Sequence, residues 1–261
     1  MDFLGLRTLT VISDTIKLVK KCRGIDVKID KEMNDKKVFE ETWQSGNTSG
    51  VFQFESQGMR NFMKELKPDC LEDIIAGVSL YRPGPMDQIP RYIRGKQNPG
   101  HNEYTHPSLE PILNVTYGCM VYQEQVMQIV RDLAGYSLGR ADLVRRAMGK
   151  KKLDVMAKER EVFINGQVDE NGNIIVPGCV RNGIDAESAN KIFDEMSEFA
   201  KYAFNKSHAA CYAVVAYRTA YLKSYYPAEF MASMLNSFLG NLDKVPEYLS
   251  LIHISEPTRR S

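Results

Sequence analysis

The chain has 261 residues, of which 43% are hydrophobic and 26% charged, and its net charge is +1. This composition is typical of a globular protein with one large or two modest hydrophobic cores. It has no apolar run of the ~20 residues that cross a bilayer. Its five scattered cysteines contain no Cys-x-x-Cys pair and indicate neither a zinc site nor a disulfide framework.

The first 80 residues predict several helices. Apolar residues recur at helical spacing over residues 9–19, and another helical pattern covers residues 71–78. Asp35 and Ser56 are residue types that cap helices, and each precedes a further helical pattern. Between those two helices, Gly50-Val-Phe-Gln-Phe54 favours a short strand or an extended segment.

The middle of the chain is rich in proline and glycine. Tyr81-Arg-Pro-Gly-Pro85 excludes a helix and predicts a stiff turn. That turn either holds Arg82 at a functional cleft or only ends the preceding helix. Residues 86–117 contain six more prolines and glycines in irregular sequence, so we expect loops there and a candidate joint between subdomains.

Helical patterns resume at residue 121. They cover residues 122–133, 138–148, 154–163, 185–200, 209–225 and 227–235. A β-hairpin is predicted near 162–176, with Asn171-Gly172 as its turn. Phe204-Asn-Lys-Ser-His208 is expected to interrupt the later helices. The fold class is therefore mainly α, with short strands and one hairpin.

Positive charge is concentrated in one segment, around Gly139–Lys152. Between residues 140 and 160, eight Lys or Arg residues face three acids, a local charge of +5. Such an excess indicates a site for phosphate or another polyanion, or else a solvated basic surface. Arg145 and Arg146 fall outside the apolar stripe of their helix. The lysines at 150–152 follow its end, where a cation also stabilises the negative pole of the helix.

A second polar group lies at the expected start of the helix that follows Phe204. Exposed backbone N–H groups beside Lys206, Ser207 and His208 could hold an anion. Tyr212, one turn further on, could stack on a base. The alternatives are that His208 is a structural hydrogen-bonding residue and that Tyr212 belongs to the core. The sequence contains no P-loop, no zinc-spaced ligand set and no nucleophile elbow.

Seven blocks of the sequence resemble, in the same order, the C-family of bacterial DNA polymerases, the family of the DNA polymerase III alpha subunit. The blocks are Asp2–Leu9, Val51–Ser56, Tyr81–Pro85, Tyr122–Met127, Arg145–Lys152, Phe204–His208 and Tyr226–Phe230. The resemblance implies that residues 1–7 are the end of a palm domain and that residues 8–248 are a fingers region. Residues 249–261 resemble the translation of a sequencing adapter, which would be no part of the fold; the alternative is a genuine C-terminal extension.

The same resemblance implies two-metal nucleotidyl transfer, in which three carboxylates hold two Mg²⁺ ions. Asp2 matches one of those carboxylates and is the candidate catalytic and metal-binding residue. The family's Asp-x-Asp pair does not occur in this sequence. We therefore expect a fragment that is inactive alone and that supplies the side of the active site facing the incoming nucleotide and the template.

Several cations and polar residues are implied to bind the nucleotide. Arg145 and Arg146 would contact the triphosphate, because guanidinium groups match phosphate oxygens. Lys150 and Lys151 would add charge near the triphosphate or the template backbone. The residues implied to line the base and sugar side are Lys206, Ser207, His208 and Tyr212. Arg82 is a further candidate in the same cleft.

The implied partners are primer–template DNA and dNTP. For a full-length family member they also include the sliding clamp, the clamp loader and a proofreading subunit or domain, in the bacterial cytoplasm at the replisome; no membrane is expected. Two other interpretations remain open. The chain could be a non-catalytic helical module that binds nucleic-acid backbone. It could also be a complete phosphotransferase of another kind, although no second carboxylate is spaced to join Asp2 in a metal site.

Overall fold

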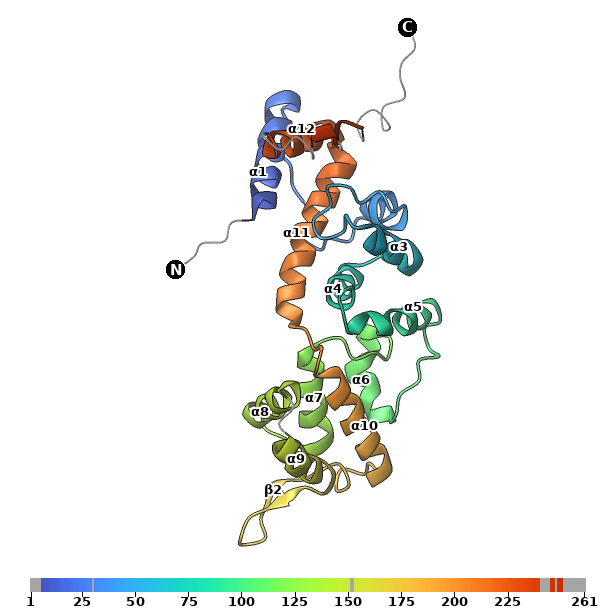
Figure 1. The fold of residues 1–261 in the computed structure, drawn as a ribbon, viewed down its shortest axis with the longest axis vertical. Helices are drawn as coiled ribbons and strands as arrows, with labels where there is room; N and C mark the ends of the chain where they lie inside the picture. Colours follow the sequence, from blue (N-terminus) through green and yellow to red (C-terminus); the bar gives the residue numbers. More distant parts are fainter. Residues whose placement is uncertain (1–5, 30, 151–152, 240–244, 247, 251–261) are drawn as a thin grey trace. The chain divides into compact units, whose positions relative to one another are not determined.

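The computed structural model describes residues 6–29, 31–150, 153–239, 245–246 and 248–250. These residues are mainly α-helical with one small sheet (Figure 1), which confirms the predicted fold class. The α-helices are α1 (Arg7–Arg23), α2 (Lys36–Val38), α3 (Gln57–Leu66), α4 (Leu71–Leu80), α5 (Ile89–Gln97), α6 (Glu110–Leu113), α7 (Gln123–Ala134), α8 (Leu138–Gly149), α9 (Leu153–Asn165), α10 (Ala186–Phe199), α11 (Lys206–Tyr225) and α12 (Pro227–Ser237). The other elements are the π-helix η1 (Phe39–Gln44), the 3₁₀ helices η2 (Pro85–Gln88), η3 (Pro107–Leu109) and η4 (Asn114–Thr116), and the strands β1 (Gln167–Val168) and β2 (Ile174–Val176).

The chain forms two compact units. The first contains residues 1–75 and 210–261, and the second contains residues 76–209. Helices α4 and α11 each begin in one unit and end in the other. The segment 86–117, predicted to contain a joint, lies inside the second unit.

In the first unit, α1 packs against α12. Val11 and Ile12 on α1 are buried in one apolar cluster with Phe230 and Met234 on α12. The helical stripe predicted in this region supplies that face, and Gly24 ends α1 in the left-handed conformation with φ of 69°. The first unit therefore buries the apolar faces of two helices from opposite ends of the sequence.

A group of aromatic rings forms another part of the first unit. Trp43 is fully buried, and its ring centroid lies 5.4 Å from Phe39, 5.7 Å from Phe54 and 6.2 Å from Tyr217. Such offset and tilted contacts stabilise a core beyond the area they bury.

The strand predicted over residues 50–54 is wrong. These residues form successive turns, in which Val51 N–H donates to Thr48 O and Phe54 N–H donates to Val51 O. Gly50 has φ of 76° and Gln53 has φ of 67°, both in the left-handed region, which is incompatible with an extended strand. The aromatic residues of this segment are buried by a turn rather than by a sheet.

In the second unit, α7, α8, α9 and α10 pack around one core. Its residues come from the predicted stripes and include Val126 and Ile129 on α7, Val144 on α8 and Phe193 on α10. The helices start where capping residues were predicted. The side chain of Asp185, for example, accepts a hydrogen bond from Ser188 N–H at 2.8 Å.

The proline-rich segment 86–117 is more helical than predicted. The short helices η2, α5, η3 and α6 each carry a proline in their first two positions, namely Pro85, Pro90, Pro107 and Pro111. Proline is compatible with the first helical turn, because the N–H groups there have no partner within the helix. These prolines therefore start helices instead of excluding them.

The predicted hairpin is present but shorter than expected. β1 pairs antiparallel with β2 between residues 167 and 176, and residues 162–165 belong to α9 instead. Its turn is closed by Asp169, whose side chain accepts from Asn171 N–H at 2.9 Å and from Asn173 N–H at 2.7 Å.

Among the described helices, none is long and apolar enough to cross a membrane.

Candidate functional site

Helix α8 presents the two arginines singled out from the sequence. Ser137 starts this helix by accepting a hydrogen bond from Arg140 N–H at 3.3 Å, and the buried face of the helix contains Val144. Arg145 and Arg146 lie outside that face, and both contact Asp142. The distances to the two carboxylate oxygens are 2.5 Å from Arg145 and 2.7 Å from Arg146.

Asp142 therefore neutralises part of the charge of this pair. The hydrogen bond from Arg145, together with the charge of both guanidinium groups, holds the pKa of Asp142 below its usual value. The side chain of Arg145 is only 23% exposed, whereas that of Arg146 is 62% exposed. Arg146 is thus the member of the pair more open to a ligand.

The other cations of the basic segment divide into two groups. Arg140 forms an ion pair with Glu159 at 3.1 Å, and Arg160 forms one with Asp194. Lys150 follows α8 and is exposed, while Lys151 lies outside the described residues. Much of the predicted positive charge is therefore compensated inside the protein.

The first turn of α7 connects α8 to the start of α11. Arg145 Nη1 donates to Gln123 Oε1 at 3.1 Å, and Gln123 N–H donates to Phe204 O at 2.9 Å. The carboxylate of Glu124 accepts from Lys206 N–H at 3.1 Å and from the side chain of Asn205 at 3.1 Å. These hydrogen bonds bring Arg145 and Lys206 to the same end of α7.

The first turn of α11 carries three predicted site residues. Asn205 caps this turn, because its Oδ1 accepts from His208 N–H at 2.8 Å. For this reason α11 begins at Lys206, and the interruption predicted at Phe204–His208 ends there. Ser207 and His208 are exposed, and Lys206 Nζ lies 5.1 Å from the ring centroid of Tyr122.

Arg82 joins the same group through Phe204. Its guanidinium lies 4.1 Å from the Phe204 ring centroid, Nε donates to Ser79 O at 2.8 Å, and Nη2 donates to Tyr202 O. Burial lowers the pKa of Arg82. Gly84 is required nearby, because it has φ of 102° and a Cβ there would lie 2.3 Å from the Tyr202 ring. The stiff turn thus holds Arg82 on backbone carbonyls of the protein.

Two predicted residues stand apart from this group. Tyr212 belongs to the first unit, where its ring centroid lies 5.3 Å from that of Phe52. Asp2, the predicted catalytic and metal-binding residue, lies outside the described residues. The residues that the structure gathers near the end of α7 are Arg82, Arg145, Arg146, Lys206, Ser207 and His208.

The residues that connect this group were not among the predicted site residues. Gln123 and Glu124 lie in a block that carried the family resemblance, and only this resemblance could have indicated that they belong to the site. Asp142 was counted only as a charge that reduced the basic excess. Its spacing of three and four residues from the arginines is nevertheless that of helical ion pairs, and could have indicated the shared carboxylate.

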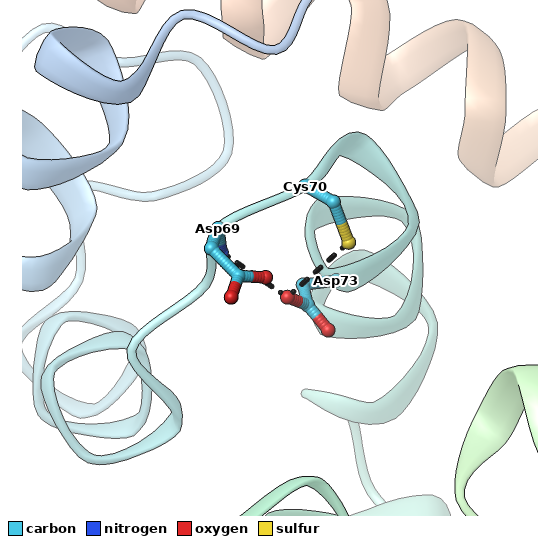
Figure 2. Close-up of side chains that lie close together, drawn as sticks. All are labelled: Asp69, Cys70 and Asp73. Atoms are coloured by element: carbon cyan, nitrogen blue, oxygen red, sulfur yellow. Dashed lines mark hydrogen bonds between the residues drawn. The ribbon is translucent and has the colours of Figure 1, made fainter.

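Three potential metal ligands lie together in the first unit. Figure 2 shows Asp69, Cys70 and Asp73, whose ligand atoms all lie within 4.8 Å of one another. Asp73 Oδ2 accepts from Asp69 N–H at 3.2 Å and from the Cys70 thiol at 3.5 Å. A carboxylate that accepts from the residues just before α4 acts as a cap for that helix, and this role explains the cluster.

Comparisons with known proteins match the chain to one group. The model of the bacterial DNA polymerase III alpha subunit finger domain matches residues 8–171. The DNA polymerase III subunit alpha of Thermus aquaticus is 49% identical over 255 residues, which are 95% of this chain and 20% of that protein. The protein of that name from Pseudomonas aeruginosa is 47% identical over 255 residues, 94% of this chain and 21% of its own length. The chain spans about a fifth of the length of the curated relatives it matches.

Proposed function

Because the chain belongs to the family of bacterial DNA polymerase III alpha subunit finger domains, we propose that it supplies the incoming-nucleotide side of a DNA-directed DNA polymerase. The substrates in this proposal are dNTP and primer–template DNA. The supporting observation is the set of hydrogen bonds that links Arg145, Gln123 and the first turn of α11 at one end of α7.

Arg146 and Arg145 have different parts in this proposal. Arg146, the more exposed, binds the triphosphate directly through charge-assisted hydrogen bonds. Arg145, held between Asp142 and Gln123, fixes the position of the pair and adds positive charge where the leaving pyrophosphate develops negative charge. Lys150 and Lys151 add charge beside the same phosphates.

The first turn of α11 contributes the second side of the pocket. Lys206, Ser207 and His208 are proposed to line the base and sugar. The backbone N–H groups of Lys206 and His208 are already occupied by Glu124 and Asn205, so the proposed contacts come from the side chains of this turn. In this pocket Arg82 supports Phe204 by stacking on its ring.

Magnesium is proposed for the complete active site, where it would stabilise the reacting phosphate oxygens. The described carboxylates near the arginine pair do not fit a metal pair, because Asp142 is engaged by two arginines and Glu124 by backbone and amide donors. Asp2 is the one candidate ligand proposed from this chain. The sliding clamp, the clamp loader and the proofreading partner likewise belong to the longer protein.

The test uses a chimaera in which this chain replaces the matching fifth of the Thermus aquaticus relative. Changing both Arg145 and Arg146 to Ala should lower kcat/KM for dNTP by about 100-fold, because a charge-assisted hydrogen bond contributes ~1.5–3 kcal/mol. Loss of Arg146 should raise KM, and loss of Arg145 should lower kcat. The control changes Arg131 and Arg181 to Ala, which removes the same charge elsewhere in the second unit.

A specific result would contradict the proposal. If the Arg145 and Arg146 variant lost only salt-sensitive DNA affinity and kept its use of dNTP, these arginines would bind nucleic-acid backbone. The chain would then act as a helical nucleic-acid-binding module.

A further inference from the structure

Helix α5 borders a hollow that has no part in the proposed nucleotide site. The hollow has a volume of about 550 Å³, and its lining includes Arg91 and Arg94 on α5, His101 on the following loop, and Tyr117. Arg91 and Arg94 lie three residues apart and so project from one face of the helix. The opposite face, with Tyr92 and Ile93, is buried.

The two arginines of this hollow are not neutralised by the protein. Both are exposed, and neither forms an ion pair with any residue that the structure describes. Arg91 donates to the backbone carbonyl of Glu103 at 3.3 Å, and the carboxylate of Glu103, which also lines the hollow, forms no ion pair with either arginine. The arginines of the α8 segment, by contrast, are each paired with a carboxylate.

The positive potential of these arginines extends into the protein. Burial raises the pKa of the Cys119 thiol to about 11, while the charges of Arg91 and Arg94 act in the opposite direction, stabilising the thiolate. Two unpaired guanidinium groups on a concave surface are the arrangement that binds phosphate oxygens.

An aromatic ring forms the wall beside these cations. Tyr117 lines the hollow, is partly exposed, and is held by an edge-to-face contact with Tyr92 at 5.0 Å. Its φ of 53° is rare for an aromatic residue, and strained backbone of this kind is concentrated at binding sites. Gly95 allows this position, since a Cβ there would lie 2.6 Å from Tyr117 Cβ.

We propose that the hollow over α5 binds a phosphodiester segment of single-stranded DNA. Arg91 and Arg94 bind the phosphate oxygens, and a base stacks on Tyr117. Cations that follow a backbone beside an aromatic ring are the combination by which proteins hold single strands without reading their sequence. The inference rests on the proposed function, in which primer–template DNA is a substrate.

The test measures binding of a fluorescein-labelled oligo(dT) of about ten nucleotides to the 261-residue chain by anisotropy. The Arg91→Gln plus Arg94→Gln variant should bind at least tenfold more weakly. Its slope of log K against log salt should fall by about 1.4, since each single-strand phosphate contact contributes ~0.7. The control, Arg131→Gln plus Arg181→Gln, loses the same charge and should bind like wild type. Equal weakening of both variants overturns the proposal.

Two further measurements test the strand and the stacking. Inorganic phosphate at matched ionic strength should leave the oligonucleotide bound. If phosphate displaced it fully, the hollow would bind phosphate alone, and the proposed binding of a DNA strand would be wrong. In the wild-type chain, an oligonucleotide with 5-iodouracil should crosslink to Tyr117 on irradiation, mapped by mass spectrometry. Crosslinks found only at other residues overturn the stacking. Circular dichroism melts verify that each variant is folded.

The two proposals can fail separately. In the chimaera, the Arg91 and Arg94 variant should raise the KM for DNA rather than the KM for dNTP, whereas the Arg145 and Arg146 variant should leave oligo(dT) binding within twofold of wild type. A loss of oligo(dT) binding in the Arg145 and Arg146 variant alone overturns the hollow as the strand site. If the Arg145 and Arg146 variant loses dNTP use and the Arg91 and Arg94 variant keeps it, the result supports the nucleotide pocket.

Discussion

Gln125 is a buried amide that ties the loop before α7 to that helix, and its replacement by methionine tests how the site is held. Its Oε1 accepts from the N–H groups of Val121 and Tyr122 at 2.8 and 2.9 Å. Its Nε2 donates to Thr116 Oγ1 at 2.8 Å. The residue is 4% exposed, so water cannot replace these hydrogen bonds.

The expected loss of stability in Gln125→Met follows from the backbone N–H groups that lose their acceptor. Methionine has a similar volume, so the change creates little cavity. Two buried N–H groups lose their acceptor, and each unsatisfied group costs ~1–3 kcal/mol. Better burial of the apolar side chain offsets roughly 1 kcal/mol of this. The free energy of unfolding should therefore fall by about 1–5 kcal/mol.

Urea unfolding followed by far-UV circular dichroism measures this loss, with Gln123→Met as a matched control. Gln123 is only partly buried, and its side chain accepts a single hydrogen bond from Arg145, so its replacement should cost less than about 1 kcal/mol. If the two variants unfolded at the same urea concentration with equal slopes, the buried amide would not be the anchor of this loop.

Three further outcomes follow from other positions. Gly95→Ala should destabilise the protein by about 1–3 kcal/mol in urea unfolding, because the new Cβ would lie 2.8 Å from the Tyr117 carbonyl oxygen. The control, Gly139→Ala at an open helical position, should stabilise it by about 0.5–1 kcal/mol. A Gly95→Ala variant more stable than the Gly139→Ala variant would refute the crowding at Gly95. Arg82→Lys should cost about 1–3 kcal/mol in the same assay, because lysine cannot reproduce the two guanidinium hydrogen bonds and the ring stacking; an unchanged midpoint would contradict this. Burial lowers the pKa of Lys223 to about 8, below its ordinary value of 10.5, so between these pH values the unfolded chain binds more protons and stability should rise with pH. Tryptophan fluorescence in urea would measure that rise, and Lys223→Met should abolish it.

The helices were predictable because their signals are local. Asp35, Ser56, Ser137 and Asp185 each accept a hydrogen bond from a backbone N–H two or three residues further on. The apolar stripes between these caps give the buried faces. A neighbour in sequence is enough to decide such features, so no knowledge of the rest of the fold was needed.

The errors occurred where one local signal is compatible with two structures. Proline excludes a helix interior but suits a first turn, so Pro90 and Pro107 begin helices where loops were expected. Alternating aromatic residues suit a strand, yet the left-handed conformations of Gly50 and Gln53 turn that segment instead. In both cases the packing of distant residues selects between the alternatives.

By itself, the sequence determined the mainly α-helical class, most helix starts and the presence of a basic segment that contains Arg145 and Arg146. Only the tertiary structure decided which cations remain unpaired. Arg140 meets Glu159 nineteen residues away, whereas Arg91 and Arg94 meet no described carboxylate and border a hollow. The physical reason is that the charge available to a ligand depends on partners that folding brings together, and spacing along the chain reveals such partners only within a helix.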